Sequence, residues 1–228
     1  LHAQGCPWDE WTCMVAARGG HLEVLQWLRT KDCPWDEEVC TEAALGGHLE
    51  MLQWARKHGC PWDMWTCVSA ARGGHLQVLQ WLHVEGCPWN AMTCRAAAQE
   101  GHLKVLQWLR EPAQNCPWDA RTCQAAAEGG HLKVLKWLRD PAQGCPWDAL
   151  TCQAAARGGH LEVLKWLREP AQGCPWDAWT CVAAAANGHL EVLQWLHDEG
   201  CPWDKQACTQ AATIRSHENI LNWIKNLD

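Results

Sequence analysis

Cysteine and histidine recur at fixed spacings along this chain of 228 residues, and both residue types could do chemistry. The 16 cysteines form two columns: one opens each Cys-Pro-Trp tripeptide, beginning with Cys6, and the other follows seven residues later, beginning with Cys13. A Gly-His pair comes next, beginning with His21. Cysteine and histidine together suit zinc, paired cysteines suit disulfides, and histidine suits general acid–base catalysis.

The spacing disfavours zinc within one repeat. Cys6 precedes an expected helix and His21 follows it, about 13 Å away at about 1.5 Å per residue, whereas the ligands of one tetrahedral ion lie within roughly 4 Å of each other. Cys6 and Cys13 share one end of the helix hairpin, which leaves open a disulfide within a repeat or between neighbours. The favoured interpretation is buried thiols, because an intracellular compartment keeps cysteine reduced. We expect no metal and no cofactor.

The histidine column is also interpreted as structural. A catalytic histidine needs a nucleophile and an orienting partner nearby, and neither recurs with it. The sequence shows no Ser-His-Asp order, no Gly-rich phosphate loop and no paired carboxylates at fixed spacing. The histidines are therefore predicted to form a ladder of turn hydrogen bonds. The sequence predicts that the protein is not an enzyme.

The same columns divide the chain into repeats. The Cys-Pro-Trp tripeptides are 27 or 29 residues apart, and 19 Trp with no Tyr and no Phe indicate copying of one unit. A period of about 20 to 50 residues is typical of a solenoid, whose core comes from stacking of neighbours. The predicted repeats are residues 6–32, 33–59, 60–86, 87–115, 116–144, 145–173, 174–200 and 201–228, the last being a C-terminal cap. Residues 1–5 are expected to end a preceding repeat, so the sequence is predicted to be part of a longer protein.

Each repeat is predicted to hold two helices. Asp9 is a good N-cap for a helix over Glu10–Arg18, which ends at a Gly-Gly pair. Leu22, Leu25 and Leu28 form the apolar stripe of a second helix, whose tryptophans, such as that at position 81, are expected in the core. No strand pattern occurs, so the fold class is all-α, a solenoid of stacked antiparallel helix pairs.

Three repeats carry a two-residue insertion after the second helix. The insertions contain Pro112, Pro141 and Pro170. Because proline cannot continue a helix, we expect each second helix to end there. Three adjacent loops are predicted to protrude on one edge.

The segment Ala16-Ala17-Arg-Gly-Gly-His-Leu-Glu-Val-Leu, with its counterparts in the other repeats, resembles the Ala-Ala-x-x-Gly-His-Leu-Glu-Val-Val heart of the ankyrin repeat. The resemblance covers nearly the whole chain. It departs at the repeat length, which is about 33 in ankyrin repeats, and at Trp11-Thr-Cys-Met, where that family has Thr-Pro-Leu-His. The chain looks like a short Cys-Pro-Trp-Asp variety without long hairpin fingers. The family resemblance implies protein binding without catalysis.

Composition limits the classes of partner that the protein is expected to bind. The net charge of −7 argues against a phosphate-tracking surface, so no nucleic acid is expected. No stretch of about 18 apolar residues occurs, so no membrane span is expected. No secretory leader is visible, which indicates an intracellular, cytoplasmic location.

Function is expected where the repeats differ. Three positions of the first helix, represented by Trp11, Met14 and Arg18, vary between repeats, and their i, i+3, i+7 spacing places them on one face. The predicted partner-binding residues are Trp11, Met14, Trp65, Val68, Arg72, Arg95, Arg121, Arg157, Trp179 and Val182, with the three tryptophans as anchors. This predicts a protein-protein interaction module or scaffold. The alternative is a structural linker or spacer, permanently docked as a subunit of a large assembly, with the variation being drift on a solvated surface.

Overall fold

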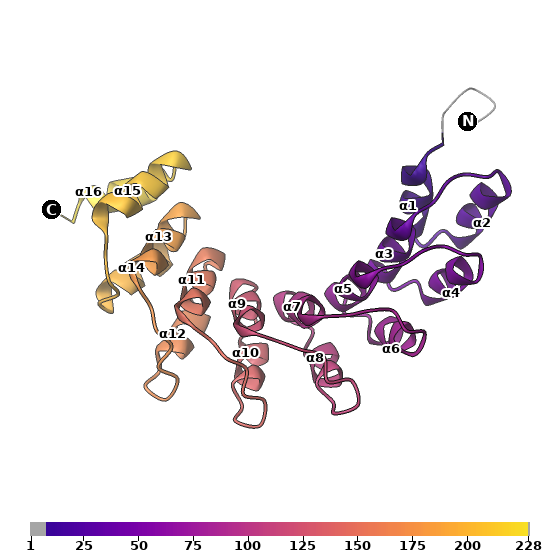
Figure 1. Cartoon of the computed structure of the whole chain (residues 1–228). Helices are drawn as coiled ribbons and strands as arrows, with labels where there is room; N and C mark the ends of the chain where they lie inside the picture. The colour runs from indigo at the N-terminus through magenta and orange to yellow at the C-terminus, as the bar shows by residue number, and fades with distance from the viewer. Residues whose placement is uncertain (1–7, 228) are drawn as a thin grey trace. The chain divides into compact units, whose positions relative to one another are not determined.

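The structure is a computed structural model in which residues 8–227 are described. This part of the chain contains 16 helices and no strand (Figure 1). The chain divides into two compact units, Leu1–Pro117 (unit 1) and Trp118–Asp228 (unit 2). The expected end of a preceding repeat, residues 1–5, and Cys6 lie outside the described residues.

Both units are stacks of helix pairs. In unit 1 the helices are α1 (Glu10–Arg18), α2 (Leu22–Thr30), α3 (Glu37–Leu45), α4 (Leu49–Lys57), α5 (Met64–Arg72), α6 (Leu76–Val84), α7 (Ala91–Gln99) and α8 (Leu103–Leu109). In unit 2 they are α9 (Ala120–Glu128), α10 (Leu132–Leu138), α11 (Ala149–Gly158), α12 (Leu161–Arg168), α13 (Ala178–Ala186), α14 (Leu190–Asp198), α15 (Lys205–Ile214) and α16 (Glu218–Lys225). Within each unit the odd-numbered helices pack side by side, as α3 and α5 do. The predicted all-α solenoid is confirmed.

Local sequence signals determine where the odd-numbered helices begin and end. Asp36 has an extended backbone and accepts a hydrogen bond from the Glu38 amide at 3.0 Å, which satisfies an N–H that lacks a partner in the helix. At the other end Gly47 adopts a φ of 75°, a left-handed conformation that glycine reaches without a Cβ penalty. The chain then reverses into the next helix within three residues.

The core lies between the two helices of each pair and between neighbouring pairs. In the third pair, Cys67, Ala71, Leu79 and Leu82 are all fully buried. Each buried leucine contributes about 1.5–3 kcal/mol relative to exposure. The alanines allow the odd-numbered helices to approach closely, so the stacking direction is lined by small side chains.

The prolines follow the ends of three even-numbered helices. Helices α8, α10 and α12 end at Leu109, Leu138 and Arg168, two or three residues before Pro112, Pro141 and Pro170. Thus the predicted helix ends are confirmed. In unit 2 the loops after α10 and α12 project from the same edge (Figure 1). The third loop, after α8, belongs to unit 1.

Candidate functional site

The first cysteine column joins each helix pair to the pair before it. The Sγ of Cys60 donates to the backbone oxygen of Asp36 at 3.3 Å, and the Sγ of Cys87 donates to that of Asp63 at 3.3 Å. The same bond recurs from Cys33, Cys116, Cys145, Cys174 and Cys201 to residues 9, 90, 119, 148 and 177. All 15 described cysteines are free and at most 4% exposed, so cysteine is part of the core, as expected.

The second cysteine column faces the first column of the next pair. A side-chain hydrogen bond with Cys87, together with burial, raises the pKa of Cys67. Burial and a hydrogen bond with Cys33 raise the pKa of Cys13 to about 12. Because the thiolate is the reactive form, these cysteines are poor nucleophiles at neutral pH. Among residues 8–227 no group of three or more His, Cys, Asp or Glu side chains could hold a metal ion.

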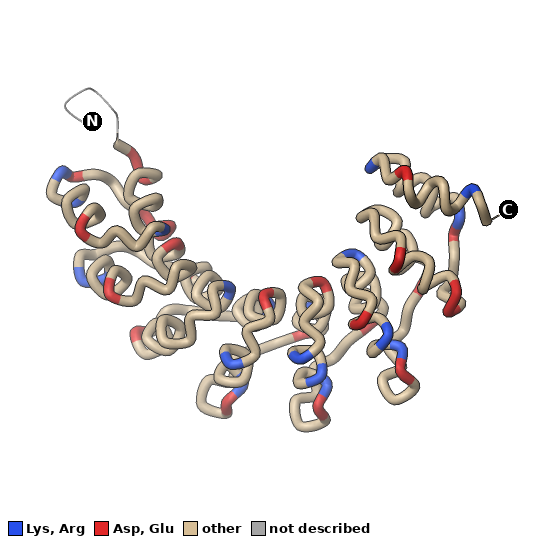
Figure 2. Tube along the Cα trace, turned by 180° about the vertical axis from the view of Figure 1, so that it is seen from behind, with Lys and Arg blue, Asp and Glu red and all other residues tan. Residues whose placement is uncertain are grey.

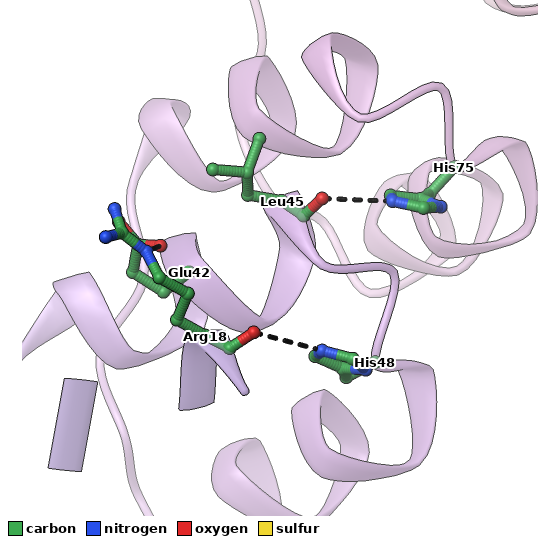
Figure 3. Close-up of polar contacts among 5 residues, drawn as sticks. All are labelled: Arg18, Glu42, Leu45, His48 and His75. Carbon is green, nitrogen blue, oxygen red and sulfur yellow. Dashed lines mark hydrogen bonds and ion pairs between the residues drawn. The ribbon is translucent and has the colours of Figure 1, made fainter. Parts of the chain in front are cut away.

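The histidines also bond between neighbouring pairs rather than within their own turns. The Nε2 of His75 lies 3.0 Å from the backbone oxygen of Leu45, and that of His48 lies 3.3 Å from the backbone oxygen of Arg18 (Figure 3). The same contact recurs at His102, His160, His189 and His217. These oxygens belong to the last turn of an odd-numbered helix, where carbonyl groups lack a partner in the helix. The structural interpretation of the histidine column is confirmed.

In most of the pairs, the glycine before the histidine makes room for the histidine of the next pair. A Cβ on Gly74 would lie 2.6 Å from the Nδ1 and Cε1 atoms of His102, and Gly74 has a φ of 73°. Both steric space and backbone conformation therefore require glycine at this position. The Gly-His column interlocks neighbouring pairs.

The paired tryptophans line the edge of the stack. Trp62 and Trp81 meet edge to face at 5.6 Å, and Arg56 stacks on Trp62 at 3.8 Å while its Nη1 donates to the Cys60 backbone oxygen at 2.7 Å. Trp81 is half-buried, which corrects its expected place in the core. The indole needs one face for its partner ring and keeps the other at the surface. Within residues 8–227, Trp166 of α12 is a buried tryptophan of this column, at 7% exposure.

The odd-numbered helices expose the three expected anchor residues. Trp11, Trp65 and Trp179 are 66%, 45% and 64% exposed. Leu150, in the same column, is 49% exposed. Arg72, Arg121 and Arg157 are also exposed: Arg72 shares α5 with Trp65, Arg157 shares α11 with Leu150, and Arg121 lies on α9.

The middle position of the expected face, which Met14 occupies in the first repeat, is buried or half-buried in several repeats. Met14 and Val68 are 5% and 2% exposed, so neither can contact a partner. Their column points at the next helix pair: the Nε2 of Gln124 donates to Asp148 Oδ1 at 3.0 Å, at the start of the following odd-numbered helix. Arg95 and Val182, in the same column, are half-buried. This column therefore serves mainly the stacking of neighbours, which corrects the predicted role of Met14 and Val68.

Three predicted residues meet in one cleft of unit 2. A cleft of about 300 Å³ is lined by Gln153, Arg157, Trp179, Val182, Ala183, Ala186, Asn187 and Arg215. It brings together Arg157, Trp179 and Val182 from α11 and α13. Sequence reasoning missed Asn187 and Arg215, which lie where most other repeats have glycine; that departure from the repeat was the available signal. The remaining predicted residues do not line this cleft.

The first described helix pair exposes apolar side chains that later pairs bury. Val24 is 47% exposed, whereas Val78, at the same position two pairs later, is 2% exposed. Together with Trp8, Val15 and Trp27, Val24 lines a cleft of about 630 Å³. No described helix pair covers this surface.

Charged side chains are interspersed along the described chain (Figure 2). None of its helices has the length and apolar character needed to span a bilayer.

Comparison with known proteins agrees with the fold. No curated protein matches the sequence. The family model described as "Ankyrin repeats (many copies)" matches residues 40–83 and 123–168. The human ASB11 ankyrin repeat domain, a crystal structure, is similar with a TM-score of 0.55 and 20% identity, covering 84% of this chain and 99% of that one. Domains of this kind are generally protein-protein interaction modules and typically lack catalytic activity. The family model thus identifies ankyrin repeats in both units of the chain, and the solved ankyrin repeat domain shares its fold.

Proposed function

We propose that this protein is a non-catalytic interaction module or scaffold that binds a protein partner through the exposed face of its odd-numbered helices. Trp11, Trp65 and Trp179 are the anchors of that face. Arg72, Arg121 and Arg157 are polar contacts around them, and the half-buried Arg95 and Val182 lie at its margin. The family supports the general role, and the exposed side chains support the choice of surface.

The observation that carries the proposal is the exposure of Trp11 and Trp179, at 66% and 64%. Burial of an aromatic ring is worth more than burial of most side chains, so an exposed indole forgoes much of that stabilisation. The paired tryptophans at the edge of the stack have ring partners, as Trp62 has Trp81. Tryptophan and arginine are the residue types that most often dominate binding energy in interfaces. A partner that covers the face would supply the missing burial.

Quantitative affinity capture tests the proposal. The tagged full chain and its Trp11→Ala/Trp65→Ala variant are used as baits, and bound proteins are measured by mass spectrometry. A variant of Val84, which is 81% exposed at the end of α6, serves as the matched control (Val84→Ala). We expect captured partner to fall at least about tenfold with the double variant, equal to about 1.4 kcal/mol, and to stay unchanged with the control.

Circular dichroism must show equal helix content for all baits. If the tryptophan variants retain every partner, the exposed face does not bind. The spacer function would then be the better explanation, since a permanently docked spacer does not depend on these rings.

A further inference from the structure

The cleft of unit 2 combines two arginines with apolar side chains. Its apolar lining comes from Trp179, Val182, Ala183 and Ala186, all of α13. Arg157, in the last turn of α11, and Arg215, just after α15, also line it. None of its lining residues is acidic. We propose that this cleft binds an acidic peptide segment of a protein partner, with a carboxylate on the arginines and an apolar side chain against Trp179.

The two arginines are available to a ligand. Arg157 contacts Glu128 at 3.5 Å, but the two side chains are 50% and 39% exposed, and such a pair is worth only about 0–1 kcal/mol. No described residue forms an ion pair with Arg215, which is exposed. The planar guanidinium can hold a carboxylate through two parallel hydrogen bonds. A carboxylate that reaches both arginines gains more than either surface ion pair alone.

The carboxylates next to the cleft are engaged by side chains of this protein, Glu128 by Arg157 and Asp177 by Gln153. Asp177, the N-cap of α13, accepts from Gln153 Nε2 at 3.0 Å through each carboxylate oxygen and also accepts from the Thr180 backbone in a capping box. Asn187 donates to the Ala183 backbone oxygen at 2.9 Å. The net charge of −7 has little effect here, because the Debye length is about 8 Å at physiological ionic strength. Local charge therefore favours an anionic segment.

The apolar part of the cleft limits the ligand to a peptide with mixed character. A small anion would leave the Trp179 ring, 64% exposed, uncovered. The volume of about 300 Å³ fits a few side chains rather than a folded domain. In unit 1, by contrast, Arg18 is held by Glu42 through bonds of 2.8 and 3.2 Å (Figure 3). That arginine is already paired with a carboxylate of this chain.

The inference rests on the proposed function and specifies its partner. A phage library of random dodecapeptides is selected on the immobilised full chain, and the enriched peptides are synthesised. We expect enriched peptides to contain more Asp and Glu than the starting library, next to an apolar residue. Their affinity should fall at least tenfold in the Arg157→Gln/Arg215→Gln variant and in Trp179→Ala. It should also fall when salt rises from about 50 to 500 mM, since exposed charges are screened.

The control is Lys136→Gln, which removes an exposed charge from α10 in the same unit. Equal loss of affinity in this control, enrichment of neutral or basic peptides, or no enrichment would overturn the inference. Peptides that bind without charge preference and lose affinity only in Trp11→Ala/Trp65→Ala would overturn it while leaving the proposed function in place. No peptide enrichment on the full chain, together with unchanged partner capture by the Trp11→Ala/Trp65→Ala variant, would remove both proposals.

Discussion

Replacing two tryptophans of unit 2 tests which ring belongs to the core and which to the proposed interaction face. Trp166 is 7% exposed on α12, and Trp179 is 64% exposed on α13. We replace each by alanine in the full chain. Trp166→Ala removes a buried ring, and such truncations cost about 3–5 kcal/mol of unfolding free energy.

The expected cost of Trp179→Ala is smaller. About a third of its surface is buried, roughly 50–90 Å² of the 150–250 Å² that an aromatic residue can bury. At about 25 cal/mol per Å², this area is worth about 1–2 kcal/mol. The higher helix propensity of alanine offsets about 0.5 kcal/mol of that. Trp166→Ala should therefore destabilise the protein by at least about 1.5 kcal/mol more than Trp179→Ala.

Urea unfolding, followed by circular dichroism and by tryptophan fluorescence, measures the difference. Both probes are needed because repeat arrays can unfold in steps. If the two variants lose the same stability, the Trp179 ring is part of the core and the proposed interaction face is wrong. If Trp179→Ala is neutral for both stability and capture of partners, its ring is ordinary surface.

Other predictions concern the contacts between neighbouring pairs. Gly74→Ala should cost at least about 2 kcal/mol, because it adds a clash with His102 to left-handed backbone strain of about 1–2 kcal/mol. Gly59→Ala, at a φ of 83° with nothing within 4 Å of a Cβ, should cost the strain alone; equal urea midpoints would refute the interlock. The pKa of Cys13, raised to about 12 by burial, lies above the ordinary thiol value of about 8.5, so the folded state holds this proton longer than the unfolded state. The contribution of this thiol to the free energy of unfolding should thus be fully present below about pH 8.5 and fall as pH rises toward 12. Urea midpoints that stay level from pH 8 to 10 would contradict the buried thiol.

Much of the fold could be predicted because its signals act over a few residues. Asp9 caps α1, the glycines after Arg18 end it, and Leu25 and Leu28 are buried as their spacing predicted. The bounds of the eight repeats stay a proposal. The Cys-Pro-Trp segment belongs to two neighbours at once: Trp35 pairs with Trp54 of its own repeat and with Arg29 of the preceding one.

The candidate site was only partly predictable. The exposure of Trp11 and Trp179 followed from their absence from the constant columns. Helical spacing alone could not place Met14 and Val68, because a helix position becomes buried only when a neighbouring helix covers it. The cleft brings together Arg157 and Arg215, which are 58 positions apart in the chain, and side chains of α13 that lie between them in sequence.

The sequence by itself determined the helices, their ends and their repetition, since caps, glycine turns and apolar periodicity are local properties. Only the tertiary structure decided which variable positions face solvent, which thiols and histidines bond between pairs, and where a cleft opens. These depend on the angle and distance at which one helix pair packs on the next. Close packing of alanine and cysteine side chains sets that geometry. One column of each odd-numbered helix therefore faces the neighbouring helix, and another column stays exposed.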